Sequence, residues 1–351
     1  MDLTNRTIWQ HSAGDGKRDY ADICIKWNVA LVGPGWQGAW PECQKDLQKE
    51  VSSRKLTNMK LFFETVKDKD IIVLRIGTGA VSAVGEVVGG YEWNDEFGDI
   101  DGWDIQHVRR VRWLWKQEGE SKQFPAYTMK RGDTTQQLTS HEVIEWLKGL
   151  EIPEQAYKRS IPELPPANVS SKVTLEQVSE YLFNIGVSSN SIEILVREIS
   201  ELSRIANWYW HANEPASERE TVAYLVVPLL RSLGWTPQRM AIEWNAVDVA
   251  LFEKLPRNNE NLTVVVEAKK KGDGCLSAQS QAEGYARDKV SCHRLIVTDG
   301  IRYGVFTRSE GKFKLHAYLN LTEMRNSYPI YGCGGTKDAL SAMTPEWNPI
   351  E

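Results

Sequence analysis

Three residues of the chain combine the side-chain types and the spacing of a hydrolytic metal site: Asp248, Glu267 and Lys269. Asp248 lies in the middle of the apolar stretch 246–252, and the other two end the apolar stretch 262–269. Side chains two residues apart on a β-strand share a face, so Glu267 and Lys269 project together, and Asp248 on the paired strand can meet them there. An acid inside so apolar a strand is costly unless it is paired or binds a metal.

Carboxylate oxygens at close range are the ligands that Mg²⁺ prefers, in an octahedral shell that keeps several waters. Such an ion polarises a phosphoryl oxygen and lowers the pKa of a bound water, and a nearby lysine can orient or deprotonate that water. The trio therefore predicts phosphodiester hydrolysis with Mg²⁺, for which Mn²⁺ can substitute. A structural ion pair between Asp248 and Lys269 is the alternative, but buried pairs are weak stabilisers and this one leaves Glu267 unexplained.

A helix should precede the two strands and begin at Ser217. Ser217 and Glu220 fit a capping box, which gives Glu220 a structural role and leaves Glu218 free to point elsewhere. Gly234 should end this helix, and Pro228 inside it should kink it. A second helix should follow the strand that ends in Glu267-Ala268-Lys269, the E-x-K strand. Two polar residues, Gln281 and Tyr285, stand at i and i+4 on one face of this helix.

The order of a helix bearing Glu218, then D-x(18)-E-x-K, then Q-x-x-x-Y resembles the PD-(D/E)xK nuclease superfamily. The Q-x-x-x-Y element is similar to the one in RecB-like members. The stretch from Ser217 to Trp235 is similar to the N-terminal nuclease region of type I restriction motor subunits. One departure is Val247, because many members have a proline directly before the first acid.

This resemblance covers about residues 213–308 and implies a restriction-endonuclease-like mixed sheet flanked by helices. It implies that Glu218 joins Asp248 and Glu267 as a metal ligand or orients one. It also implies that Gln281 and Tyr285 face the active site and the DNA.

The length of 351 residues favours two domains, and four prolines between residues 152 and 171 indicate the boundary. Two amphipathic helices, about 174–185 and 191–210, are expected to act as a connector or an oligomerisation element. The predicted organisation is a reader domain over 1–150, a Pro-rich linker over 151–172, a helical connector over 173–212, a nuclease over 213–330 and a tail over 331–351.

The first domain should contain a strand at 70–76 and another from Ala80 to Val88, joined by Gly77–Gly79. These glycines suggest a dinucleotide fingerprint, but the segment after them alternates and is β-branched, so a hairpin turn is the better interpretation. A helix should begin at the N-cap Ser140. The strand pieces, with 102–113, resemble a PUA-like fold of the EVE and YTH kind. That resemblance implies a small β-barrel that recognises modified bases, often by flipping the base between aromatic rings.

Nine of the fourteen tryptophans precede residue 150, more than one small core requires. Stacking on an aromatic ring is worth about 1–3 kcal/mol per base. Core packing is the alternative for each ring. The candidates for base contact stand beside Gly-rich or polar turns: Trp27, Trp36, Trp93 and Trp103. Arg110 and Arg112 should share one strand face and are candidates for phosphate contact, with a merely solvated face as the alternative.

Composition excludes several classes of function for the protein. The net charge of −5 argues against sequence-blind binding of phosphate over the whole surface. No window approaches the roughly 18 apolar residues of a membrane span, and residues 1–5 lack a signal pattern, so a cytoplasmic protein is expected. The five scattered cysteines support neither a disulfide framework nor a zinc site.

Together these features predict a two-domain protein of α+β and α/β type. Its expected function is that of a modification-dependent restriction or phage-defence endonuclease, which reads a modified base in DNA and cuts the backbone with Mg²⁺. A single site cuts one strand, so double-strand cleavage calls for a homodimer, for which the 174–210 helices are the candidate contact. RNA is the alternative substrate, since YTH- and PUA-like domains commonly serve RNA. A non-catalytic reader or assembly subunit is the third reading, against which the intact trio counts.

Overall fold

The computed structural model describes residues 1–14, 18–166, 169–212 and 216–347. The chain divides into two compact units, Met1–Asn168 and Val169–Glu351, each with its own mixed β-sheet and helices. The division falls inside the segment where the prolines predict a boundary.

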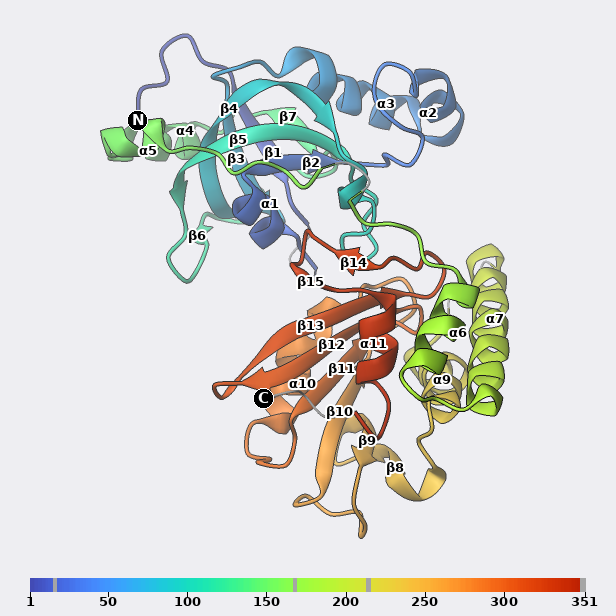
Figure 1. Cartoon of the computed structure of the whole chain (residues 1–351). Helices are drawn as coiled ribbons and strands as arrows, with labels where there is room; N and C mark the ends of the chain where they lie inside the picture. Colours follow the sequence, from blue (N-terminus) through green and yellow to red (C-terminus); the bar gives the residue numbers. More distant parts are fainter. Residues whose placement is uncertain (15–17, 167–168, 213–215, 348–351) are drawn as a thin grey trace. The chain divides into compact units, whose positions relative to one another are not determined.

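Unit 1 is built on a sheet with the strand order β2-β5-β4-β3-β1-β7, to which β6 adds by pairing with β4. The sheet curls into a half-barrel (Figure 1), whose strand order ends at β2 and β7. Its strands are β1 (Ile8–Ser12), β2 (Val29–Val32), β3 (Ile71–Ile76), β4 (Ala80–Trp93), β5 (His107–Lys116), β6 (Lys122–Gln123) and β7 (Thr135–Gln137). Its helices are α1 (Ala21–Trp27), α2 (Gln44–Glu50), α3 (Ser53–Lys60), α4 (His141–Gly149) and α5 (Glu154–Lys158).

Local sequence signals of unit 1 produce the expected elements. The glycine-rich turn joins β3 to β4 as an antiparallel pair, so the hairpin prediction is confirmed. Ser140 caps α4, because its hydroxyl accepts a hydrogen bond from the backbone N–H of Val143. β1 and β3 are parallel, so their carboxyl ends lie together at one edge of the sheet, with Ser12 paired to Arg75.

The proline-rich segment is packed rather than extended as a spacer. It contains α5, in which Ala156 is buried. Further along, the carbonyl of Pro165 accepts a hydrogen bond of 2.9 Å from the buried amide of Asn94. The described part of the predicted linker up to residue 166 therefore belongs to unit 1, because its carbonyls satisfy polar side chains of that unit.

Unit 2 contains an eight-stranded mixed sheet with the order β14-β15-β13-β12-β11-β10-β9-β8. Its strands are β8 (Met240–Trp244), β9 (Val247–Phe252), β10 (Leu262–Ala268), β11 (Arg294–Thr298), β12 (Arg302–Ser309), β13 (Lys312–Asn320), β14 (Ser327–Tyr328) and β15 (Cys333–Gly334). Its helices are α6 (Leu175–Asn184), α7 (Ser189–His211), α8 (Glu218–Thr221), α9 (Val227–Ser232), α10 (Gln279–Ala286) and α11 (Thr336–Ala342).

Helices cover both faces of this sheet (Figure 1). α6, α7, α9 and α11 share one apolar core with the face that carries Val264 and Val266. α10 covers the other face, which carries Val265, and approaches it through the buried Ala282 and Ala286, with the buried Ala278 directly before the helix. α10 also makes the crossover that leaves β10 and β11 parallel.

The helix that precedes the sheet begins as the sequence predicts. The backbone N–H of Glu220 donates to the Ser217 hydroxyl at 3.2 Å, and the Ser217 N–H donates to the Glu220 carboxylate at 2.8 Å. The helix continues through a π-helical segment, Val222–Val226, into α9, where Pro228 stands at the start. Proline offers no N–H to an i→i−4 bond, and the wider π turn lies directly before it.

Two segments expected to lie outside the predicted nuclease domain belong to the core of unit 2. α6 and α7 form where predicted, but Leu182, Leu195 and Leu202 pack into the same core as the sheet, so these helices are no separate connector. The segment expected as a tail contains β15 and α11, with Leu340 and Met343 fully buried.

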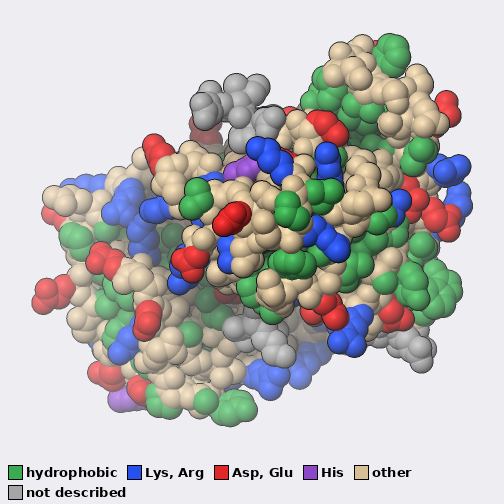
Figure 2. All heavy atoms as spheres, turned by 90° about the horizontal axis from the view of Figure 1, so that it is seen from below, with side chains coloured by type: hydrophobic (Ala, Val, Ile, Leu, Met, Phe, Trp, Pro, Cys, Tyr) green, Lys and Arg blue, Asp and Glu red, His purple; other side chains and the backbone are tan. Residues whose placement is uncertain are grey.

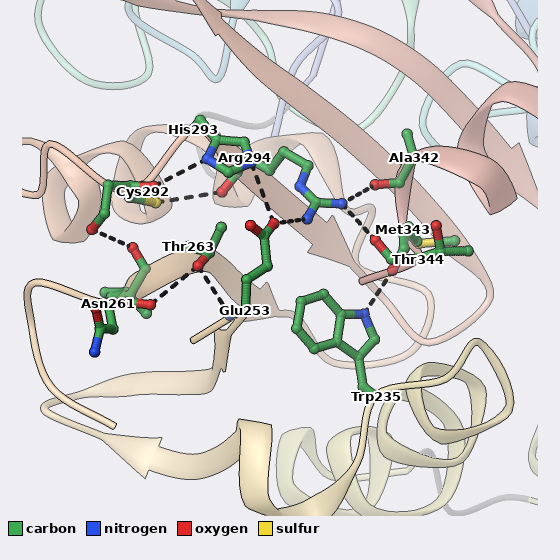
Figure 3. A network of polar contacts seen from close by, with 12 residues as sticks. Trp235, Glu253, Asn261, Thr263, Cys292, His293, Arg294, Ala342, Met343 and Thr344 are labelled. Carbon is green, nitrogen blue, oxygen red and sulfur yellow. Dashed lines mark hydrogen bonds and ion pairs between the residues drawn. The ribbon is translucent and has the colours of Figure 1, made fainter. Parts of the chain in front are cut away.

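A buried network holds this last segment in place (Figure 3). The guanidinium of Arg294 donates to the carbonyls of Ala342 and Thr344 and to the carboxylate of Glu253 at 2.6 Å. The indole N–H of Trp235 donates to the carbonyl of Met343 at 2.7 Å. The carbonyls that follow α11 are thus bound by side chains from other parts of unit 2.

Candidate functional site

The predicted trio comes together on unit 2. β9 pairs antiparallel with β10, with Val249 opposite Val266, so the next step places Asp248 opposite Glu267 on the same face. The backbone N–H of Ala268 donates to Asp248 Oδ2 at 2.7 Å, which fixes this carboxylate against β10. Lys269 lies one residue beyond β10, and its N–H donates to the carbonyl of Thr298 at 2.7 Å, so the extended geometry continues through it.

Glu267 is the most unusual acid of the site. It is 2% exposed, and its Oε2 atom is buried without a hydrogen-bond partner. Lys269 Nζ lies 3.6 Å from the other oxygen, Oε1. Burial and the neighbouring charge of Asp248 raise the pKa of Glu267 to about 7, with a smaller contribution from Glu218, whereas Lys269 acts in the opposite direction. The local structure therefore leaves this carboxylate unsatisfied.

The polar face of α10 positions the lysine. Lys269 Nζ donates to Gln281 Oε1 at 2.8 Å, and Gln281 Nε2 donates to the Tyr285 hydroxyl at 3.2 Å. Gln281 and Tyr285 stand one helical turn apart, as their spacing predicts. The amine is thus held between Gln281 and Glu267.

A hard cation fits the donor set of this site. Within the ranges that the structure describes, no three His, Cys, Asp or Glu side chains converge closely enough to hold a metal by themselves. Asp248 and Glu267 do share one face, and Mg²⁺ is commonly bound by one or two carboxylates plus waters and substrate phosphates. The buried oxygen of Glu267 without a donor matches what such an ion would satisfy. Glu218 is exposed at the first position of α8, and its charge still acts on Glu267.

Unit 1 has a pocket of about 550 Å³ at the carboxyl ends of β1 and β3. Its wall includes three aromatic side chains, Tyr20, Trp103 and Tyr127, together with Arg75 and Arg131. Tyr127 is 74% exposed and has a φ of 67°, a left-handed conformation that is strained for a residue with a side chain. Such strain at a pocket is more typical of a binding site than of a loop without function.

Only one of the four candidate tryptophans reaches this wall. Trp103 lies against Tyr20 at 5.5 Å, and the guanidinium of Arg18 lies 4.3 Å from the centre of its ring. Trp36 is largely exposed away from the pocket wall. Trp27 and Trp93 are partly buried outside that wall, and the Trp93 indole N–H donates to the carbonyl of Gly35 at 3.1 Å.

Sequence reasoning missed Tyr20 and Tyr127, because it considered only tryptophans. The one signal for Tyr127 is its place in a segment without apolar periodicity, two residues after Pro125. Tyr20 is buried and its hydroxyl donates to the carbonyl of Ser12. Nothing in its spacing distinguishes it from a core residue.

The two arginines expected to bind phosphate are engaged by unit 1 itself. Arg112 donates to Glu86 Oε1 at 2.6 Å and to the carbonyl of Arg159 at 3.0 Å, and Arg110 donates to the carbonyl of Pro162. These contacts weigh against the expected phosphate-facing surface, because Glu86 and main-chain carbonyls already accept hydrogen bonds from both guanidinium groups.

Surface charge and the cysteines agree with the composition. Acidic and basic side chains are interspersed over the face shown in Figure 2, without a large area of one sign. The five cysteines, all within the described ranges, form no disulfide. None of the helices in the described ranges is long and apolar enough to cross a membrane.

Comparisons with known proteins bear on unit 1 alone. Residues 9–143 match the family model of a domain of unknown function, DUF8426. That range contains all strands of the half-barrel and the wall of its pocket. Neither the curated proteins nor the solved structures include a match to this chain.

Proposed function

We propose that unit 2 is a Mg²⁺-dependent endonuclease of the PD-(D/E)xK type, and that unit 1 directs it to DNA carrying a modified base. The observation that carries the proposal is the buried Oε2 of Glu267, which has no hydrogen-bond donor although it shares a face with Asp248 and Lys269. Leaving a buried acceptor unsatisfied costs about 1–3 kcal/mol or more for a charged group. In a site with only a structural role, nothing would offset this free-energy cost.

The order of elements in unit 2 supports the same proposal. A capped helix bearing Glu218 is followed by the antiparallel strands β8, β9 and β10, the crossover helix α10, and β11 parallel to β10. The helix after the E-x-K strand presents Gln281 and Tyr285 toward Lys269. This is the arrangement that the PD-(D/E)xK resemblance implies.

Each residue then has a distinct task. Asp248 and Glu267 would hold Mg²⁺, with Glu218 in a supporting position. When bound, the ion supplies Lewis-acid polarisation of the phosphoryl group and a bound water with a lowered pKa. Lys269 orients or deprotonates the attacking water and balances the charge that develops on the phosphate. Gln281 accepts from the lysine amine and holds it at the carboxylate.

Unit 1 would select the substrate. Its pocket has aromatic walls and a volume large enough for a single extruded base. Reading one base requires no extended basic surface, which agrees with the net charge of −5. The proposed biological role is restriction of foreign DNA, with phage defence as its setting.

The test incubates the purified chain with Mg²⁺ and with four matched substrates: DNA and RNA, each with and without modified bases. We expect cleavage of modified DNA, loss of cleavage in EDTA and recovery with Mn²⁺. Equal cleavage of both DNA substrates would refute modified-base selection while sparing the nuclease. Preferential cleavage of RNA would favour the alternative substrate, and binding of DNA without cleavage would favour a non-catalytic reader or assembly subunit.

Double-strand cleavage by one site per chain further calls for a homodimer. The outer faces of α6 and α7 expose Phe183 and Ile194, which are candidates for its contact. Sedimentation of the protein on a modified duplex should show two chains per DNA. One chain per DNA with complete double-strand cleavage would contradict the dimer.

A further inference from the structure

We infer that the unit 1 pocket binds a nucleotide through its phosphate as well as its ring, with the buried guanidinium of Arg75 as the anion anchor. This inference deepens the reader role proposed above and rests on it. It assigns an anionic ligand to a pocket whose aromatic wall alone would suggest only stacking.

Arg75 is a buried cation without an anionic partner. It is 3% exposed, and within the described ranges it forms no ion pair with Asp or Glu. Its donors meet only neutral acceptors, namely the carbonyl of Gly77 and the carbonyl of Asp133 at 3.0 Å. The Asp133 carboxylate is itself bound by Arg54, whose Nε and Nη2 each lie 3.1 Å from it.

Two residues of the pocket wall carry donors without acceptors. Arg75 Nε and the indole Nε1 of Trp103 are both buried without a hydrogen-bond partner. Burial lowers the pKa of Arg75, and the nearby Tyr20 and Asp133 only partly oppose this effect. Unsatisfied donors on a buried cation are expected where an anion completes the site.

A buried arginine alone would not point to a ligand, as Arg109 shows. Arg109 is 4% exposed and donates to the carbonyls of Phe62 and Phe63, but it is not part of the wall of the unit 1 pocket. Arg75 differs because it forms part of the wall of an open pocket. Arg131, exposed at the same wall, adds a second positive charge.

The aromatic part of the pocket wall fits a flat ring beside the anion. Tyr127 is exposed at the pocket, and its backbone N–H donates to the Thr78 hydroxyl at 3.1 Å, which fixes the segment that carries the ring. An aromatic face stacks any nucleobase, whereas a guanidinium recognises phosphate oxygens. Ring and anion together describe a nucleotide better than a nucleoside or a free phosphate.

Calorimetric titration of the full chain in EDTA tests this inference, because EDTA removes any contribution of nuclease activity. The probes are deoxycytidine and 5-methyldeoxycytidine, their 5′-monophosphates, a trinucleotide with the methylated base in its centre, and inorganic phosphate. We expect a monophosphate to bind about tenfold or more tightly than its nucleoside, as a charge-assisted hydrogen bond predicts. The trinucleotide distinguishes a phosphate within a strand from a free one.

Two variants separate the anion from the ring. Arg75→Gln should remove most of the preference for the monophosphate over the nucleoside, whereas Tyr127→Ala should weaken binding of both and keep their ratio. Arg131→Gln, at an exposed position, gives a smaller loss of the phosphate preference and serves if Arg75→Gln fails to fold in a thermal melt. Equal affinity of the wild-type protein for nucleoside and nucleotide, or no binding of any probe at millimolar concentration, overturns the inference. Cleavage of DNA that persists in either case shows that the nuclease proposal stands separately.

Discussion

Glu253 comes just after β9 and Glu267 lies on the neighbouring strand β10, and their carboxylates meet opposite surroundings. Glu253 directly follows β9, and its Oε1 atom accepts from Arg294 at 2.6 Å and lies 3.5 Å from His293 Nε2. Figure 3 shows these groups turned toward one another. Burial tends to raise the pKa of Glu253, but His293 and Arg294 outweigh it and the pKa is lowered.

Burial and the charge of Asp248 raise the pKa of Glu267, and Lys269 is the neighbour that lowers it. The pKa is therefore raised to about 7. The comparison separates two uses of an acid in unit 2, one partly buried and one fully buried. A carboxylate whose partners are complete holds the chain together, whereas one that the fold leaves incomplete is available to a ligand. Glu253 therefore serves the docking of the C-terminal segment, and Glu267 serves the proposed metal site.

The largest predicted effect is the loss of cleavage rate when Lys269 is replaced. Lys269→Met removes the group that handles the attacking water, so we expect the cleavage rate to fall by about 10²–10⁴-fold. Lys270→Met, at the exposed neighbouring position, is the matched control and should cut at the wild-type rate. Single-turnover assays at saturating Mg²⁺ measure both. Equal losses in the two variants would remove Lys269 from the proposed chemistry.

The stability of the fold should depend more on Glu253 than on Glu267. Glu253→Gln leaves the buried Arg294 without its charge partner, so the free energy of unfolding should fall by about 3 kcal/mol. Glu267→Gln removes an unsatisfied charge and should leave the stability in EDTA unchanged or raised. Urea unfolding at pH 8 compares the variants. A larger loss for Glu267→Gln than for Glu253→Gln would show that Glu267 is a structural partner.

The pH dependence of unfolding sharpens the same contrast. The folded pKa of Glu267, about 7, lies above its ordinary value of 4.5, so the folded protein binds the proton more tightly than the unfolded chain. The contribution of this group should make the metal-free protein lose stability as the pH rises from about 4.5 to 7. Glu267→Gln should abolish that slope, which a pH series of urea midpoints in EDTA detects. A slope that survives the substitution would assign the titration to another group.

A smaller effect is expected from the residue that positions the lysine. Gln281→Ala removes the acceptor 2.8 Å from Lys269 Nζ, and supporting contacts of this kind typically change activity by about 10–100-fold. The loss should appear as a lower kcat with little change in KM. Gln279→Ala, which removes a contact to Glu283 on the same helix, is the matched control. A loss of DNA affinity with unchanged kcat would make Gln281 a binding residue instead.

Local rules predicted the parts of the fold that depend on neighbours in sequence. Side-chain periodicity puts Glu267 and Lys269 on one face of the strand and Val266 on the other. Capping and turn chemistry predict the capping box at Ser217 and the hairpin at Gly77–Gly79. The meeting of Asp248 with Glu267 followed as well, because a short polar loop joins their strands and fixes their pairing.

The missed features depend on contacts between segments far apart in sequence. Arg110 and Arg112 look like a free basic face until residues 159–162 return to cover them. α11 has no strong pattern of its own, and its burial depends partly on Arg294, nearly fifty residues earlier. The pocket of unit 1 forms where the ends of β1 and β3 meet residues 126–134, so its tyrosines could not be grouped from spacing alone.

The central claim is that Asp248 and Glu267 form a metal-dependent nuclease site. The most direct measurement compares Mg²⁺-dependent cleavage of modified DNA by the wild-type chain, by Asp248→Asn and by Asp273→Asn, an exposed acid in the loop after the E-x-K strand. We predict that Asp248→Asn folds with an unchanged thermal transition and leaves the DNA intact, whereas Asp273→Asn cuts at the wild-type rate. Cleavage by Asp248→Asn at the wild-type rate would contradict the account.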